Sequence, residues 1–71
     1  MPQNTEDRIG NIMPFFKYEH LPEKLQAVSK PFGELAKTMV ETLPLCNDET
    51  LAGLCKLLEA KDCFVRAALS Q

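Results

Sequence analysis

The sequence has too few catalytic and metal-binding side chains for most sites of those kinds. It contains one histidine, His20, whereas activation of a nucleophile requires a general base beside it. It lacks both the glycine-rich phosphate loop and the dinucleotide-binding fingerprint. Its three cysteines, Cys46, Cys55 and Cys63, form no CxxC pair and have no histidine nearby, unlike the ligands of zinc sites. We therefore expect a protein that is not an enzyme and that holds no metal and no cofactor.

Other absences bear on compartment and on large partners. No apolar run reaches the roughly 20 residues of a membrane-spanning helix, so we expect no membrane partner. The first ten residues, MPQNTEDRIG, are polar and acidic, which predicts no signal peptide and hence reduced thiols in the cytoplasm. Eight Lys and Arg against ten Asp and Glu give a net charge of −2, which argues against a DNA or RNA polymer as partner. A few cations can still converge on a small phosphate ligand.

The apolar residues that are present predict a first long helix. They recur at alternating spacings of four and three, which predicts one kinked helix of about 22 residues that continues through Pro31. Gly33, beside the proline, predicts a point where another backbone or a ligand comes close. The repeating positions are Leu21, Leu25, Val28, Phe32, Leu35, Met39 and Leu43.

A short turn and a second helix follow. Pro44 is expected to end the first helix, and Asn47 or Asp48 to cap the next one. A short connection between two amphipathic helices predicts an antiparallel helical hairpin in an all-α protein. We place this helical-hairpin domain at residues 13–71 and a polar N-terminal tail at residues 1–12. The predicted buried stripe of the second helix is Leu51, Leu54, Leu58, Val65 and Leu69.

Three of the five aromatic residues lie between Met13 and Tyr18. One interpretation is that Phe15 and Phe16 close the open end of the hairpin, and the other is that Tyr18 offers a ring on which a ligand stacks; the two are compatible. His20 is expected to fix the entry of the chain into the first helix.

The second helix has an apolar arc that one neighbouring helix does not cover. Leu57, Phe64 and Ala68 widen this arc to roughly half the circumference. In so short a chain, such a face predicts self-association. Cys55 flanks the arc and is expected in the core, whereas Cys63 is expected to be exposed.

Charged residues interrupt the stripe of the second helix. Asp62 falls inside it and needs a partner, which Arg66 at i,i+4 or the adjacent Lys61 can provide. One interpretation is a structural ion pair of Asp62 with Arg66 that fixes helix or subunit geometry. The other is that Asp62 orients Arg66 toward a ligand phosphate. Lys30 is expected to form an exposed i,i+4 pair with Glu34.

Two long segments, FKYEHLPEKLQAVSKPFGELAKTMVETLP and KLLEAKDCFVRAAL, resemble the small helical-hairpin domain of phage-encoded sponge proteins that counter bacterial CBASS and Thoeris immunity. The resemblance covers about residues 16–69, and the pieces FxYxHLP and LLEAKDxxVRA carry it. It implies a homo-oligomer, a dimer or a hexamer, in the cytoplasm of an infected bacterial host cell. Such an oligomer sequesters cyclic nucleotide or cyclic ADP-ribose-type messengers without cleaving them.

The resemblance also implies binding residues. Tyr18 matches an aromatic residue that stacks on a base, Lys30 or a neighbouring position matches a lysine in the first helix, and Arg66 matches an arginine late in the second. With His20 and Lys61 beside them, these residues form the expected ligand-binding set. The chain lacks the additional ligand-binding domain of larger members. Two alternatives remain open, a helical protein-interaction module and a structural oligomer, both without a nucleotide ligand.

Overall fold

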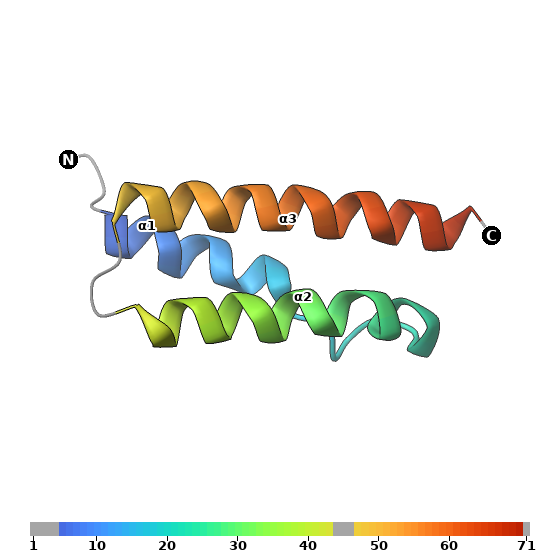
Figure 1. Cartoon of the computed structure of the whole chain (residues 1–71). Coiled ribbons are helices and arrows are strands. Elements are labelled where there is room, and N and C mark those ends of the chain that lie inside the picture. The colour runs from blue at the N-terminus through green and yellow to red at the C-terminus, as the bar shows by residue number, and fades with distance from the viewer. Residues whose placement is uncertain (1–4, 44–46, 71) are drawn as a thin grey trace.

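The computed structural model describes residues 5–43 and 47–70, and all regular structure within them is helical, as predicted. The elements are α1 (Thr5–Ile12), the 3-10 helix η1 (Met13–Phe16), α2 (Glu23–Thr42) and α3 (Asp48–Leu69). The two long helices, α2 and α3, lie side by side and run in opposite directions (Figure 1). The short N-terminal elements add a second layer, because α1 packs on α3 and η1 packs on α2. Within the described residues no helix has the length and apolar character needed to cross a bilayer.

The prediction of a single first helix through Pro31 is confirmed. α2 has Pro22 as its N-cap residue, includes Pro31 and ends at Thr42. Proline removes one backbone donor from a helix, but the apolar residues before and after it stay in phase, so packing against α3 continues across it. Leu43 is extended, with φ −80° and ψ 127°, as expected for a residue that precedes a proline. Residues 44–46, and with them the expected stop at Pro44, lie outside the described residues.

The start of α3 is fixed by a reciprocal cap at Asn47, one of the two predicted capping residues. The Asn47 side chain accepts a hydrogen bond from the Thr50 backbone N–H at 3.0 Å, and the Thr50 hydroxyl accepts one from the Asn47 N–H at 3.3 Å. This capping box satisfies two donors that a helix start leaves free. Asp48 and Glu49 follow in the first turn, where the helix dipole favours acids.

The prediction of a polar tail is wrong for residues 5–12, which form α1. A helix of eight residues is too short to show a sustained apolar period and is unstable alone, so its formation depends on packing. Ile9 provides that packing, and the Thr5 hydroxyl donates a hydrogen bond of 2.6 Å to Asp48 at the start of α3. Residues 1–4 lie outside the described residues. The buried core consists of Ile9, Phe16, Ala36 and Leu54, each no more than 4% exposed.

Three positions predicted to be covered are exposed. Leu69, the last residue of the predicted buried stripe, is 65% exposed at the end of α3, so the prediction is wrong there. Cys55 lies on the surface because it follows the buried Leu54 by one residue, which turns it away from the centre of the packed stripe. Phe16 is buried, but Phe15 is 64% exposed, so the predicted closing role fits only one of the two rings. Cys63 is exposed, as predicted.

Candidate functional site

The half-buried Tyr18 borders a hollow of about 340 Å³ between the segment that follows η1 and the middle of α2. This hollow, which we call the Tyr18 hollow, combines an aromatic ring with charged groups of both signs. Its lining residues are Met13, Phe16, Lys17, Tyr18 and Glu19 on one wall and Gly33, Glu34 and Lys37 on the other.

Gly33 brings the two walls of the hollow together. A Cβ atom at this position would lie 2.7 Å from the carbonyl oxygen of Phe16 and 3.1 Å from a ring carbon of Tyr18. Contacts that short are not tolerated without movement. The segment from Phe16 to Tyr18 can therefore pack against α2 only because Gly33 has no side chain. The predicted close approach at Gly33 is therefore confirmed, with the Phe16 backbone as the approaching segment.

Hydrogen bonds hold the segment between Tyr18 and α2. The Gln26 side chain donates to the carbonyl oxygens of Leu21 at 2.7 Å and of Glu19 at 3.2 Å, and the Leu21 N–H donates to the Tyr18 carbonyl at 3.0 Å. The Tyr18 N–H in turn donates to the Glu19 carboxylate at 3.2 Å. Sequence reasoning gave the role of fixing this entry to His20 and missed Gln26. The signal was a long amide side chain in the first turn of a helix that follows a loop.

The Glu19 carboxylate is stabilised in its ionised form. Its own backbone N–H and that of Tyr18 donate to it, and the nearby Lys17 and His20 favour the negative charge further, so its pKa lies below the ordinary 4.5. His20 itself is exposed at the surface of the same segment.

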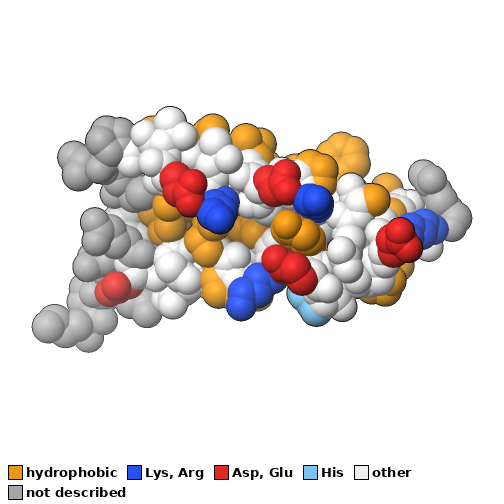
Figure 2. Space-filling view, turned by 90° about the horizontal axis from the view of Figure 1, so that it is seen from below, with side chains coloured by type: hydrophobic (Ala, Val, Ile, Leu, Met, Phe, Trp, Pro, Cys, Tyr) orange, Lys and Arg blue, Asp and Glu red, His pale blue; other side chains and the backbone are white. Residues whose placement is uncertain are grey.

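Lys30 does not line the Tyr18 hollow, although its partner Glu34 does. Its ammonium is 3.9 Å from the Glu34 carboxylate, and the two side chains are 57% and 60% exposed, as predicted for a surface i,i+4 pair. The neighbouring Ser29 points the other way, since it is buried and its hydroxyl has no hydrogen-bond partner among the described residues. Figure 2 shows acidic and basic side chains interspersed over one face of the molecule rather than gathered by sign.

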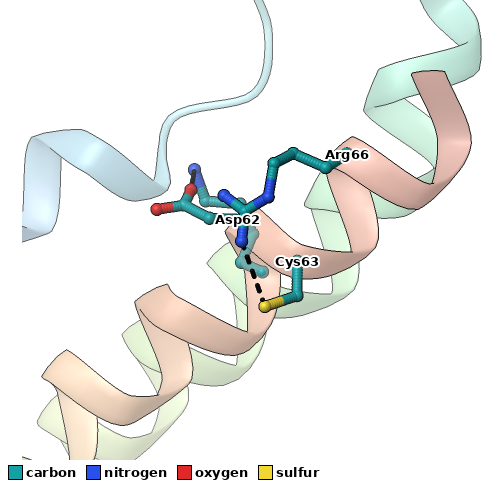
Figure 3. A network of polar contacts seen from close by, with 4 residues as sticks. Asp62, Cys63 and Arg66 are labelled. Atoms are coloured by element: carbon teal, nitrogen blue, oxygen red, sulfur yellow. Dashed lines mark hydrogen bonds and ion pairs between the residues drawn. The ribbon is translucent and has the colours of Figure 1, made fainter. Parts of the chain in front are cut away.

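Of the two partners predicted for Asp62, the structure shows Lys61, and the ion pair with Arg66 is not formed. Asp62 lies 3.1 Å from the Lys61 ammonium, and Arg66 reaches back along α3 to donate a hydrogen bond of 3.2 Å to the Cys63 sulfur (Figure 3). The cause is the burial of Lys61, whose side chain is 14% exposed against 48% for Asp62. Lys61 covers most of its side chain in the packing surface and turns its ammonium to the adjacent carboxylate. The charged side chain inside the packing surface of α3 is therefore Lys61. The half-exposed Asp62 carboxylate at the edge of this surface is its ion-pair partner.

The predicted cations and Tyr18 do not meet within one chain. Lys30, Lys61 and Arg66 are absent from the lining of the Tyr18 hollow, which instead contains Lys17 and Lys37. Sequence reasoning missed both of these lysines. The available signals were the position of Lys17 next to Tyr18 and the position of Lys37 one turn beyond Gly33.

A second surface feature is a long apolar groove between α2 and α3, which we call the α2–α3 groove. Two adjoining hollows of about 320 and 380 Å³ form it, and Glu49 is the one charged residue in their lining. The rings of Phe32 and Phe64 meet across the helices with centroids 5.7 Å apart, yet Phe64 stays 58% exposed. Leu35, Met39 and Leu43 on α2 are 46%, 42% and 41% exposed.

Within the part of the chain that the structure describes, no three His, Cys, Asp or Glu residues are grouped as a metal site would require. Comparisons with protein-family models, with curated proteins and with solved structures each find no match.

Proposed function

We propose that this protein is a non-catalytic sponge that sequesters a cyclic nucleotide or cyclic ADP-ribose-type immune messenger and so blocks antiphage signalling of the CBASS or Thoeris type. The observation that carries this proposal is the placement of Tyr18. Its ring is half-buried at the edge of a hollow that also holds two lysines. The sequence resemblance to the sponge family supplies the messenger class.

The chemistry of the Tyr18 hollow suits such a ligand. A cyclic nucleotide presents flat bases, which stack on aromatic rings, and phosphates, which attract Lys and Arg. The hollow of about 340 Å³ is at the small end of the range for ligand pockets. It is also open to one side, so a single chain offers only one wall of an enclosing site.

A second copy of the chain is proposed to supply the rest. The α2–α3 groove exposes several large apolar side chains with a single charged residue in its lining, which suits burial against another chain. In a symmetric assembly, a dimer or a hexamer, every contact occurs in duplicate. Lys30 and Arg66 are exposed but do not line the Tyr18 hollow of their own chain, so in this assembly they are proposed to reach the ligand from a neighbouring copy; Arg66 keeps N–H donors beyond the one it gives to the Cys63 sulfur. The Lys61 side chain is only 14% exposed and pairs with Asp62, so it does not take part.

The messenger is expected to remain chemically intact. Cleavage of a phosphodiester requires an activated nucleophile. The one histidine of the sequence, His20, is exposed and makes no hydrogen bond through its side chain to a described residue.

A thermal-shift screen against cyclic dinucleotides, a cyclic trinucleotide and cyclic ADP-ribose tests this function. A ligand that binds only the folded chain at about 100 times its Kd stabilises it by about 2.7 kcal/mol, which raises Tm by roughly 10–20 °C in a domain of this size. Heat denaturation of the complex should then release the unmodified messenger. Absence of any shift across the panel, or recovery of a linear product, contradicts the proposed function.

One other function is favoured by a specific observation. The α2–α3 groove could serve a protein-interaction or structural module that binds no nucleotide, because its apolar lining is also what a partner helix requires. A chain that assembles or binds a helix but shows no thermal shift with the messenger panel would support this alternative.

A further inference from the structure

We infer that Lys17 and Lys37 act as a pair that holds the phosphate of a ligand stacked on Tyr18 within the same chain. This inference rests on the proposed function, since it assigns residues to the site proposed there. It adds two binding residues that the sequence resemblance did not indicate.

The two lysines approach the Tyr18 hollow from different elements. Lys17 lies at the end of η1, directly before Tyr18, and Lys37 lies on α2, one helical turn after Gly33. Both line the hollow, one on each wall, and their side chains are long and flexible enough to turn toward a ligand that entered it. At Gly33, between them in the lining, the Tyr18 ring and the Phe16 carbonyl pack directly on α2.

Two lysines and two acids line the hollow, so its formal charge is zero, and it favours an anion only because both acids have partners of their own. Glu19 accepts the Tyr18 N–H, and Glu34 faces the Lys30 ammonium at 3.9 Å, so each carboxylate already has a partner. Lys17 and Lys37 do not belong to the ion pairs of Lys30 with Glu34 and of Lys61 with Asp62. Lys17 lies near enough to Glu19 to favour its negative charge, but the carboxylate takes its hydrogen bonds from backbone N–H groups. Their positive charges are therefore available to a phosphate, although the chain as a whole is acidic.

The alternative cations of the chain are already engaged. The Lys61 ammonium is paired with Asp62, and the Arg66 guanidinium donates to the Cys63 sulfur. A base stacked on Tyr18 brings its own phosphate close to the ring, which places Lys17 and Lys37 nearest to it.

The test uses Lys17→Gln, Lys37→Gln and the double variant, measured by isothermal titration with the panel messenger that the unmodified chain binds most tightly. Each single change should weaken binding about tenfold and the double change about a hundredfold, because a hydrogen bond to a charged group is lost each time. Lys56→Gln is the matched control, since Lys56 is an exposed lysine on α3 outside the Tyr18 hollow. Its affinity should stay within about twofold of the unmodified chain. Circular dichroism should give an unchanged helix content for all four variants.

A second experiment titrates inorganic pyrophosphate into the protein and follows the chemical shifts of the backbone amides by NMR. This experiment does not depend on knowing the messenger. Shifts should concentrate at Lys17, Tyr18, Gly33 and Lys37 and disappear in the double variant. Messenger binding that persists at full strength in the double variant overturns the lysine assignment and leaves the proposed function standing. Failure of the unmodified chain to bind any messenger contradicts the proposed function. Pyrophosphate shifts that are absent, or spread over all lysines, contradict the lysine pair independently.

Discussion

The ring of Tyr18 packs on Gly33 of α2, where a Cβ atom would lie 3.1 Å from a ring carbon and 2.7 Å from the Phe16 carbonyl oxygen. The second of these distances joins the glycine to rigid backbone rather than to the end of a flexible side chain. The position of the Tyr18 ring therefore depends on the absence of a side chain at Gly33 of α2. Any group added at Gly33 must push the Tyr18 segment outward.

Replacing Gly33 by Ala should accordingly destabilise the chain by about 1–3 kcal/mol, the usual cost of overpacking, despite the better helix propensity of alanine. Gly10→Ala is the matched control, because no atom lies within 4 Å of a Cβ built there. It should stabilise the chain by about 0.5–1 kcal/mol. Urea unfolding followed by circular dichroism measures both. Equal stability of the two variants would show that the Tyr18 segment does not rest on α2.

The α2–α3 groove should mediate self-association. Light scattering of the unmodified chain is expected to give a mass above the 8.0 kDa of one chain. The double change of Leu35 and Met39 to Gln should shift the protein toward monomer, because it places amides on a surface that association would dehydrate. Phe15→Gln is the control, since Phe15 is 64% exposed but lies outside the groove. A monomer at micromolar concentration in the unmodified chain contradicts the assembly.

The free energy of unfolding should depend more on Lys61 than on Asp62, the two charged residues that form the ion pair on α3. Lys61→Met should leave the stability nearly unchanged or raise it, because an apolar chain of similar length replaces a covered ammonium. Lys61→Ala should cost about 1–2 kcal/mol by loss of the packed stem. Asp62→Asn should cost less than about 1 kcal/mol, since Asp62 is half exposed. Thermal unfolding of the three variants checks this order, and a larger loss for Asp62→Asn than for Lys61→Ala would reverse it.

Acid should loosen the segment that carries Tyr18. The pKa of Glu19 is lowered in the folded chain below its ordinary value of 4.5. The ionised carboxylate therefore stabilises the folded chain at pH values above 4.5, and this contribution is lost as the pH falls through the folded pKa. Protonation weakens its acceptance of the Tyr18 N–H. Below pH 4.5 we therefore expect faster hydrogen exchange at the Tyr18 amide, compared with an amide of the α3 interior. In Glu19→Gln this extra pH dependence should be absent. An unchanged ratio of the two exchange rates between pH 6 and pH 3 in the unmodified chain would contradict it.

The parts of the fold that follow from long patterns could be predicted from the sequence. The continuity of α2 through Pro31 follows from the apolar residues that stay in phase on both sides of it, five of which lie within α2, and the start of α3 follows from the capping chemistry of Asn47. α1 could not be predicted, because eight residues carry one buried side chain, Ile9, and their helix is stabilised by packing on α3.

The site was predictable only where its residues are local in sequence. Tyr18 was found from its aromatic neighbours, whereas Lys37 enters the hollow because α2 passes beneath the segment at Gly33. The sequence offered both Lys61 and Arg66 as partners of Asp62 and did not decide between them. A shift of one position on a helical stripe exchanges a rim residue for a covered one, and spacing alone does not resolve it.

The most direct test of the sponge function is isothermal titration of the messenger panel into the unmodified chain, Tyr18→Phe and Tyr18→Ala. We predict tight binding of at least one messenger by the unmodified chain and nearly equal affinity for Tyr18→Phe, which keeps the ring. Tyr18→Ala should bind about ten- to a hundredfold more weakly, because base stacking contributes about 1–3 kcal/mol. No binding by the unmodified chain, or equal affinity in all three, would contradict the central claim that Tyr18 holds a messenger.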